Sequence, residues 1–195
     1  MIAGLLLAAG RSSRFGADKL CAKLNGKAVI RWSAESLSAV DAVYVIIPPG
    51  ADAITQALSR LDVRFVVNLG RQEGMASSIR AGIAALPAEA DAVLIALADQ
   101  PLVPAHVVRA LCDRWRAGDG VAAVAPGYRD GRGHPVLFGR ECFAALEELR
   151  GDVGGRGVLD ALGDRVARVH VNDAMPIDVD TPEALQTLQG IVRPS

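Results

Sequence analysis

The sequence predicts an α/β protein with a mostly parallel central sheet. Short apolar runs rich in β-branched residues alternate with longer segments of helical period, which is the pattern of consecutive βαβ units. The apolar runs contain few polar residues, as is typical of strands covered on both faces. Because 195 residues suffice for one compact domain with its own core, we expect a single domain, residues 1–195.

The predicted elements alternate regularly as far as residue 126. We expect strands at Ala3–Ala8, Ala42–Ile47, Arg64–Val67, Ala92–Leu97 and Val121–Ala125. We expect helices between them at Val29–Ala39, Ala51–Leu61, Ala76–Leu86 and Pro104–Ala117, the last with a proline in its first turn.

Beyond Pro126 the order is looser, and this part of the chain looks like a cap that binds a substrate. It contains a turn-rich stretch Gly127–His134, an extended segment Pro135–Phe138, a helix near Glu141–Leu149, a loop Gly151–Gly157 and a further short helix. Arg165–Val171 and Pro176–Val179 are strand-like. Thr181, Pro182 and Glu183 are the cap, first-turn proline and acidic residue of a helix start.

The composition favours a small anionic ligand over a polymer. A net charge of -1 gives no overall attraction to nucleic acid or to anionic lipid, so neither is expected as a partner. Cys21, Cys112 and Cys142 are an odd number without CxxC spacing, which predicts reduced thiols and a cytoplasmic protein. The apolar run Ile2–Ala9 is too short to span a bilayer and lacks a preceding basic region.

The segment from Leu5 to Lys19 combines small, hydroxyl-bearing and basic residues. Small residues let a backbone approach a ligand, serines offer hydroxyl groups, and basic side chains concentrate positive charge. They are Ala8, Ala9, Gly10 and Gly16, Ser12 and Ser13, and Arg11, Arg14 and Lys19. The position after the first strand is where α/β sheets bind ligands, so a triphosphate fits. The alternative is a solvated basic turn; GxxxxGK[ST] and GxGxxG are both absent.

Carboxylates that follow extended segments are the candidate metal ligands. Asp99 comes directly after the very apolar run Ala92–Leu97, and a carboxylate there would lie at the ligand-binding edge of the sheet. Magnesium commonly bridges such a group to phosphate oxygens. Asp178 and Asp180 supply a possible second carboxylate. The alternative for all three is the capping of a turn or helix start.

The segment Gly74–Gly82 predicts a helix start with small residues in its first turn. Ser77 or Ser78 either caps this helix or faces a base or ribose, and both interpretations stay open. Arg71 either reaches phosphate or is exposed.

Six segments occur in order over nearly the whole chain: LLLAAGRSSRFGADKL, GMASSIRAGI, ADQPL, GHPVLF, GDVGGRGVL and DVDTPEAL. Together they resemble the MobA-like nucleotidyltransferases, and particularly the molybdenum cofactor cytidylyltransferase (MocA-like) branch. The resemblance implies a Rossmann-like, three-layer, GT-A-like fold with bound Mg²⁺. It also implies that the terminal phosphate of molybdopterin attacks the α-phosphorus of a nucleoside triphosphate and releases pyrophosphate. Residues 1–126 would then form the nucleotide-binding half, and residues 127–195 the substrate-binding half with the C-terminal helix.

The resemblance also assigns roles to residues. The nucleotide-binding residues would be Leu7, Ala8, Ala9, Gly10, Arg11, Ser12, Arg14, Lys19 and Ser78. The catalytic residues would be Arg14, Lys19 and Asp99, with magnesium on Asp99 and on Asp178 or Asp180. The substrate-binding residues would be Gln100, His134, Asp152 and Arg156. His134 has the alternative role of a hydrogen-bonded turn histidine.

One position indicates which nucleotide base the enzyme uses, and two segments depart from the family pattern. Leu-Ala-Ala-Gly looks like the cytosine-using branch and Leu-Ala-Gly-Gly the guanine-using one, so Ala9 favours CTP. Lys19 is followed by Leu20-Cys21-Ala22-Lys23 instead of further leucines and a proline, so Lys23 has no assigned role. Gly154-Gly155-Arg156 stands where the branch more often has Gly-Ala-Arg.

We therefore expect a magnesium-dependent enzyme that transfers CMP from CTP to the phosphate of molybdopterin. A phosphate monoester is largely ionised near neutral pH, so catalysis rests on positioning and charge neutralisation. The alternatives are a guanylyltransferase for molybdopterin and a transferase for a sugar phosphate or other small phosphate. Two further alternatives remain. One is a carrier without catalytic activity, which delivers molybdopterin to a client molybdoenzyme or its maturation chaperone. The other is a scaffold that binds a regulatory anion.

Overall fold

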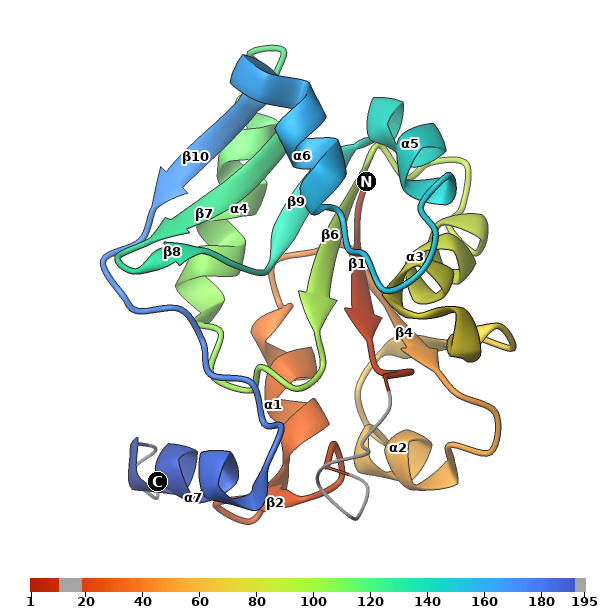
Figure 1. Ribbon diagram of the computed structural model, residues 1–195, viewed down its shortest axis with the longest axis vertical. Helices are drawn as coiled ribbons and strands as arrows, with labels where there is room; N and C mark the ends of the chain where they lie inside the picture. Colours follow the sequence, from red (N-terminus) through yellow and green to blue (C-terminus); the bar gives the residue numbers. More distant parts are fainter. Residues whose placement is uncertain (11–18, 192–195) are drawn as a thin grey trace.

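The computed structural model describes residues 1–10 and 19–191, which form a twisted sheet between two layers of helices (Figure 1). The strands are β1 (Ile2–Leu7), β2 (Lys23–Leu24), β3 (Lys27–Ala28), β4 (Ala42–Ile47), β5 (Val63–Val67), β6 (Ala92–Leu97), β7 (Ala123–Tyr128), β8 (Gly131–Arg132), β9 (Val136–Gly139) and β10 (Val166–His170). The main sheet has the order β10-β7-β9-β6-β1-β4-β5, with β8 paired to β7, and β2 and β3 form a separate hairpin.

Most strand pairs of the main sheet are parallel. β1 pairs in parallel with β4 and β6, β4 with β5, and β7 with β10. β9 is antiparallel to both of its neighbours, β6 and β7. The predicted α/β class and mostly parallel sheet are therefore confirmed.

The helices divide between the two faces of the sheet. They are α1 (Val29–Ser36), α2 (Asp52–Ala57), α3 (Met75–Ala84), α4 (Ala105–Arg116), α5 (Phe143–Glu147), α6 (Arg156–Leu162) and α7 (Pro182–Ile191), with 3₁₀ turns η1 (Arg71–Glu73), η2 (Arg140–Cys142) and η3 (Gly163–Arg165). Buried residues of α1, α2, α4 and α7 share one core cluster, and those of α3, α5 and α6 share the other.

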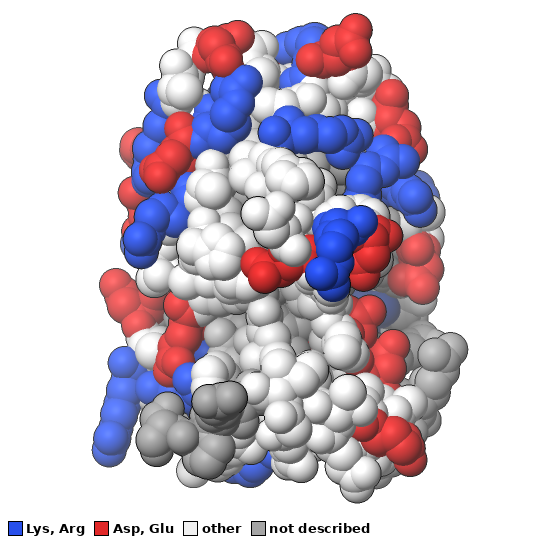
Figure 2. Space-filling model, turned by 90° about the vertical axis from the view of Figure 1, so that its left-hand side faces the viewer, with Lys and Arg blue, Asp and Glu red and all other residues white. Residues whose placement is uncertain are grey.

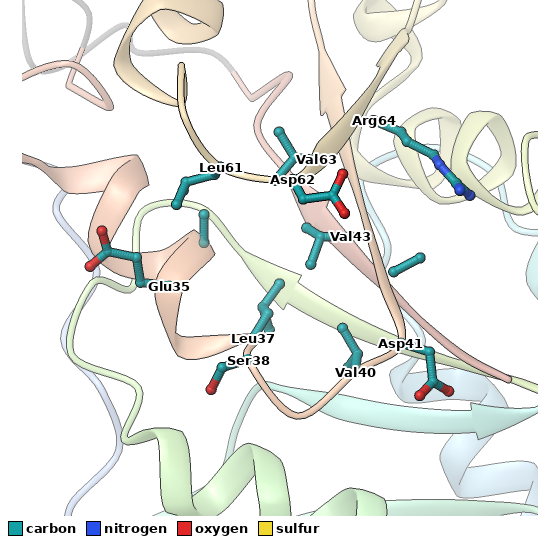
Figure 3. A pocket seen from close by; sticks show the side chains of 12 residues that line it. Glu35, Leu37, Ser38, Val40, Asp41, Val43, Leu61, Asp62, Val63 and Arg64 are labelled. Atoms are coloured by element: carbon teal, nitrogen blue, oxygen red, sulfur yellow. The ribbon is translucent and has the colours of Figure 1, made fainter.

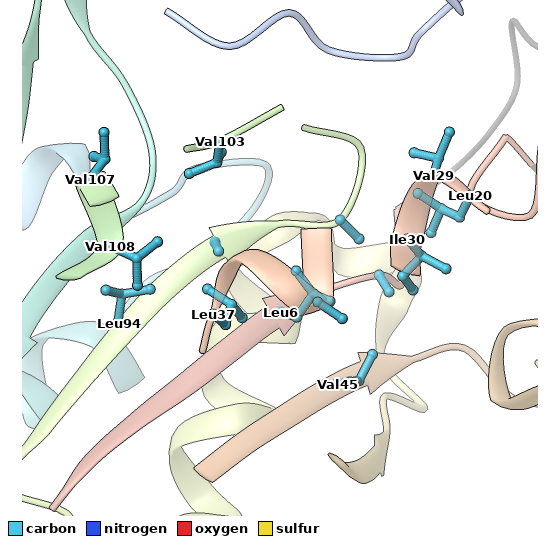
Figure 4. Packing of buried hydrophobic residues seen from close by; sticks show 14 of the residues in the cluster. Leu6, Leu20, Val29, Ile30, Leu37, Val45, Leu94, Val103, Val107 and Val108 are labelled. Carbon is cyan, nitrogen blue, oxygen red and sulfur yellow. The ribbon is translucent and has the colours of Figure 1, made fainter. Parts of the chain in front are cut away.

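Alternation along β1 separates the two clusters. Successive side chains of a strand point to opposite faces, so Leu6 packs with α1 and α4 whereas Leu5 packs with α3. Figure 4 shows the first cluster, in which Leu6 lies beside Leu37, and Val108 beside Leu94, between the sheet and the helices. A fully buried aliphatic side chain of this kind contributes about 1.5–3 kcal/mol, which makes the three-layer packing the main source of stability.

Three predicted elements differ most from the structure. The helix expected at Ala51–Leu61 is shorter and ends at Ala57. Residues 176–179 form no strand: they belong to an irregular segment in which the Val179 amide donates to the Asp99 carbonyl at 2.8 Å, rather than to a neighbouring strand. The helix expected at Glu141–Leu149 is divided into η2 and the shorter α5. The expected helix start at Thr181 is confirmed, since Thr181 Oγ1 accepts a hydrogen bond from the Ala184 amide at 3.2 Å.

The surface carries mixed charge. On the side of the molecule where β10 and α7 lie, Lys and Arg gather mainly toward one end, with Asp and Glu among them (Figure 2). No helix in the described part of the chain is both long and apolar enough to cross a membrane.

A pocket of about 410 Å³ opens where β4 and β5 begin, at the edge of the sheet opposite the predicted site (Figure 3). Three of its four charged residues, Glu35, Asp41 and Arg64, have partners within the fold, Arg64 by donating to Tyr44 Oη. Glu35 pairs with Lys27 and Arg31, and Asp41 accepts a hydrogen bond from the Ile2 amide. The pocket at the other edge of the sheet is the candidate functional site.

Candidate functional site

A pocket of about 690 Å³ lies at the carboxyl ends of the adjacent parallel strands β1 and β6. Its walls come from the end of β1, residues 71–75, the end of β6 and residues 151–152. The residues of predicted function that line it are Leu7, Ala9, Gly10, Ser78, Asp99 and Asp152. Ala8 is buried beside them, and its amide donates to the Ile46 carbonyl at 2.9 Å. Topology thus brings together residues that are far apart in the sequence.

Lys19 joins two of the predicted metal ligands. Its Nζ donates to Asp99 Oδ2 and to Asp180 Oδ1, each at 2.7 Å, and its side chain is 9% exposed. Burial alone lowers the pKa of Lys19, but the hydrogen bonds and charges of Asp180 and Asp99 outweigh burial and raise that pKa above its ordinary value. Lys19 is therefore a firmly charged ammonium at the edge of the pocket.

Asp178 points to a different partner. Its Oδ1 accepts a hydrogen bond from Gln100 Nε2 at 2.7 Å, and Gln100 Oε1 is buried without a partner among the described residues. Burial raises the pKa of Asp178, and the Gln100 hydrogen bond opposes that rise. Gln100, predicted to bind substrate, lines neither this pocket nor the one described below; it contacts the carboxylate group instead.

The carboxylates fit a small hard cation. Asp99 and Asp180 converge on one point, at present the Lys19 ammonium, and oxygen donors suit Mg²⁺ or Mn²⁺. Magnesium usually binds through one or two protein carboxylates together with substrate phosphates and water, so two converging carboxylates are enough. Residues 1–10 and 19–191 contain no group of three or more His, Cys, Asp or Glu side chains placed to hold a metal without such help.

The serines of α3 do not cap the helix. The cap position is Gly74, and no side chain bonds to the helix start from there. Ser77 and Ser78 are buried, and both accept hydrogen bonds from Asn68 Nδ2, at 2.9 and 3.0 Å. Asn68 was missed by sequence reasoning. The sequence feature that could have indicated it is a polar residue directly after the strand β5. In the structure the Asn68 amide donates to the Ile47 carbonyl at 2.8 Å.

Residues 151–152 dock on the start of α3. Asp152 Oδ1 accepts from the Met75 amide and the Gly151 carbonyl accepts from the Ala76 amide, both at 3.2 Å. A Cβ on Gly74 would lie 2.6 Å from the Gly151 carbonyl oxygen, and the φ of Gly74 is +88°, so this position requires glycine. Asp152, predicted to bind substrate, thus lines the pocket while it holds two segments together.

A second pocket of about 270 Å³ contains two further predicted substrate residues, His134 and Arg156. Met75 lines both pockets, so they adjoin. Burial lowers the pKa of His134, against the opposing charge of Asp99, and favours a neutral imidazole. The carbonyl of His134 accepts a hydrogen bond from Tyr128 Oη at 2.8 Å, which fixes the turn.

Arg11, Ser12 and Arg14, assigned to the nucleotide, lie outside the described residues. Cys112 and Cys142 are buried, and burial raises the pKa of the Cys112 thiol to about 11, so it is unsuited to nucleophilic chemistry.

Similar proteins include nucleotidyltransferases and related enzymes. The bifunctional enzyme IspD/IspF of Granulibacter bethesdensis is 39% identical over 64% of this chain and 33% of its own length. A probable molybdenum cofactor guanylyltransferase of Haloferax mediterranei is 38% identical over 61% of this chain and 57% of its own. The chain thus spans about a third to just over half the length of these curated relatives.

Solved structures match over nearly the full chain. Rv0371c from Mycobacterium tuberculosis H37Rv is 28% identical with a TM-score of 0.84, and the match covers 97% of each chain. A structure of Rv0371c in complex with manganese has a TM-score of 0.82 at 27% identity, covering 98% of this chain and 99% of that one. Residues 4–166 match the model of the MobA-like NTP transferase domain. That match spans β1, β6 and the pockets at their ends, and the chain belongs to the MobA-like NTP transferase domain family.

Proposed function

We propose that the protein transfers CMP from CTP to the terminal phosphate of molybdopterin and releases pyrophosphate. One observation carries the proposal: Lys19, Asp99 and Asp180 meet beside the pocket at the carboxyl ends of β1 and β6. A cation and two carboxylates at the ligand-binding edge of an α/β sheet are the groups that phosphoryl transfer requires.

The nucleotide would bind in the larger pocket. The backbone at Ala9 and Gly10 can approach the triphosphate because neither residue carries a large side chain. Ser78, held by Asn68, would contact the nucleoside. Lys19 would neutralise charge that accumulates on the departing pyrophosphate.

Asp99 and Asp180 would hold Mg²⁺. The bound ion would screen the charge of the phosphates and so favour approach of an anionic nucleophile. The manganese complex of Rv0371c, a similar structure of nearly the same length, supports a divalent cation.

The nucleophile needs no strong general base. The second pKa of a phosphate monoester is about 6, so an oxygen of the acceptor is already ionised near neutral pH. This oxygen would form a bond to the α-phosphorus while the bond from the α-phosphorus to the bridging oxygen breaks. The electron pair of that bond leaves with pyrophosphate. The protein's contribution is to position the two anions and to neutralise their charge.

The choice of CTP rests on Ala9, a buried residue that lines the nucleotide pocket. GTP is the second candidate, because the Haloferax mediterranei relative is named a probable molybdenum cofactor guanylyltransferase.

The test is to incubate the protein with molybdenum cofactor, Mg²⁺ and each of the four nucleoside triphosphates in turn, and to follow pyrophosphate. We expect release with CTP. Exclusive use of GTP would overturn the choice of base and keep the reaction. Stoichiometric binding of the cofactor without pyrophosphate release would favour a carrier.

A further inference from the structure

Arg71 is a partly buried cation in the wall of the nucleotide pocket. The sequence leaves two roles open for it, contact with phosphate or exposure to solvent. Glu73, from the same 3₁₀ turn η1, also lines the pocket, but its carboxylate pairs with Arg80. Arg71 forms no ion pair or side-chain hydrogen bond with any residue in the ranges 1–10 and 19–191. Its guanidinium donors are therefore available to a ligand.

The backbone that carries Arg71 is held in place by Asn68. The Asn68 side chain is buried, its Oδ1 accepts from the Gly70 amide at 2.9 Å, and its Nδ2 donates to Ser78 Oγ at 3.0 Å. The Glu73 amide donates to the Gly70 carbonyl at 2.9 Å and closes the turn around Arg71. One buried side chain thus connects η1 to the first turns of α3, so Arg71 lies on the same side of the pocket as Ser78.

This side of the pocket is far from the groups that would bind the phosphates. Arg71 follows β5 whereas Asp99 follows β6, and three strand spacings separate β5 from β6 in the sheet. At about 4.8 Å for each spacing, the ends of these two strands lie about 14 Å apart. With the metal and the phosphates at Asp99 and the nucleoside at Ser78, as proposed, Arg71 faces the base.

A guanidinium recognises two adjacent hydrogen-bond acceptors, because its N–H groups form a planar fork. Cytosine presents such a pair at O2 and N3, and guanine presents one at O6 and N7. Uracil has a donor at N3, between O2 and O4, and adenine has its amino group beside both N1 and N7. The fork therefore fits cytosine and guanine but neither uracil nor adenine.

We propose that Arg71 is a specificity-determining residue, which selects CTP over UTP by donating two hydrogen bonds to O2 and N3 of the cytosine ring. The inference rests on the proposed function, since it requires a nucleoside triphosphate in this pocket. Ala9 has no polar side-chain atom and can discriminate only by shape, so Arg71 supplies the hydrogen-bonding part of the selection. A guanylyltransferase would use the same fork on O6 and N7 and would select GTP over ATP.

The experiment measures the binding of each of the four nucleoside triphosphates, with Mg²⁺ and without an acceptor, by isothermal titration calorimetry. The variants are Arg71→Met and Arg71→Lys. Arg109→Met is the matched control, because Arg109 is exposed on α4 and does not line the pocket. Inorganic tripolyphosphate, which has the phosphates but no base, is the fifth ligand. All four nucleotides carry the same triphosphate, so a contact to the base and a contact to phosphate give different patterns.

We expect the unmodified protein to bind CTP more tightly than UTP, and Arg71→Met to weaken CTP binding about tenfold, as the loss of about 1.4 kcal/mol would. The binding of UTP and of tripolyphosphate should stay within about twofold. Arg71→Lys should also lose most of the preference, because an ammonium keeps the charge but cannot form the fork. Arg109→Met should match the unmodified protein with all five ligands.

Equal weakening of all four nucleotides and of tripolyphosphate in Arg71→Met would place Arg71 on the phosphates and overturn the inference. Unchanged affinities in both Arg71 variants, with the fold verified by circular dichroism, would also overturn it. If the unmodified protein prefers GTP, the comparison of GTP with ATP decides in the same way.

The binding measurements are independent of the transfer reaction, because no acceptor is present. A base preference that is lost in the Arg71 variants would support the inference even if no nucleotide is transferred to molybdopterin. A preference that is retained in them would overturn it even if CMP is transferred as proposed. An unmodified protein that binds all four nucleotides equally would overturn it as well.

Discussion

Lys19 occupies the position between two carboxylates where a phosphoryl-transferring site holds a metal ion. The Lys19 side chain is buried whereas those of Asp99 and Asp180 are 24% and 49% exposed, so the cost of desolvation falls mainly on the lysine, and its two hydrogen bonds offset that cost. The lysine and a divalent cation would compete for Asp99 and Asp180. A triphosphate that draws Lys19 toward its own oxygens would therefore favour metal binding.

Replacement of Lys19 by methionine should strengthen Mn²⁺ binding without nucleotide by about tenfold, because one positive charge leaves the carboxylate pair. Electron paramagnetic resonance of free Mn²⁺ measures this. Lys23→Met, an exposed position nearby in the sequence, serves as the control. Unchanged or weaker Mn²⁺ binding in Lys19→Met would show that no competition exists.

Replacement of Asp99 by asparagine should lower kcat about a hundredfold or more with the fold intact. Asparagine keeps the shape of the aspartate side chain but lacks the charge that pairs with Lys19 and would hold magnesium. Pyrophosphate release at saturating substrates measures the effect. A rate near that of the unmodified protein would remove Asp99 from the catalytic residues.

At this scale the sequence singled out Lys19 and Asp99 as candidates and left the choice between Asp178 and Asp180 open. It did not show that Lys19 pairs with both carboxylates, because those contacts span 80 and 161 residues of sequence. Asn68 was missed for a different reason: its serine partners are only 9 and 10 residues away in the sequence, but the contact depends on how α3 packs beside the end of β5.

Among the elements, α3 lies unusually close to β1. A Cβ on Gly82 would be 2.6 Å from Leu5 Cδ1, so the Leu5 side chain packs directly against the backbone of the helix. The contact fixes the height of the start of α3 above the sheet and, with it, the position of Ser78 in the pocket.

Gly82→Val should destabilise the protein by about 1–3 kcal/mol, since the added methyl groups overpack the contact with Leu5. Urea unfolding gives the difference. Gly190→Ala, on α7 with nothing within 4 Å of the added Cβ, should be neutral or stabilising by up to about 1 kcal/mol. Equal stability of the two variants would contradict the close packing.

Helix α1 carries a pH-dependent contribution to stability. Burial is the largest single influence on the pKa of Glu35 and raises it, but the hydrogen bonds and charges of Lys27 and Arg31 together outweigh burial and lower that pKa below its ordinary value of 4.5. A carboxyl with a lowered folded-state pKa stabilises the fold above its unfolded-state pKa and loses that contribution as pH falls through the folded-state value. Glu35→Gln should therefore cost stability at pH 7 and none near pH 2, as measured by urea unfolding at both values. An equal loss of stability at both pH values would exclude a contribution of the ion pairs of Glu35 to stability.

The ends of the longer strands follow from the sequence to within about three residues, because apolar runs mark buried strands directly. The ends of the helices and the irregular structure of residues 176–179 could not be predicted in this way. Leu37 continues the apolar period beyond the last residue of α1 and is still buried in the following turn. Three of residues 176–179 are apolar and make the segment strand-like in sequence, yet a strand requires a partner, and pairing is a property of the whole sheet.

At the scale of the molecule, β9 joins two parts of the sheet. It lies between β6 and β7 and is antiparallel to both, although it follows them in the sequence. Residues 1–126 and 127–195, the two predicted halves, therefore share one sheet, and β7 itself crosses the boundary between them.

A chain that ends at residue 129 should not fold, because β6 and β7 would each expose an apolar edge that β9 covers. Far-ultraviolet circular dichroism and gel filtration measure this, with the full chain as the reference. A monomeric fragment with a native-like spectrum would show that the first half folds by itself.

The place of β9 also bears on how the protein is made. A ribosome delivers β6 and β7 before the strand that lies between them, so the nascent chain carries a gap in its sheet until residue 139 has emerged. During that interval the two strands could pair wrongly with each other or with another chain. The rate of translation between residues 97 and 139 should therefore influence the yield of folded protein, although it leaves the finished structure unchanged.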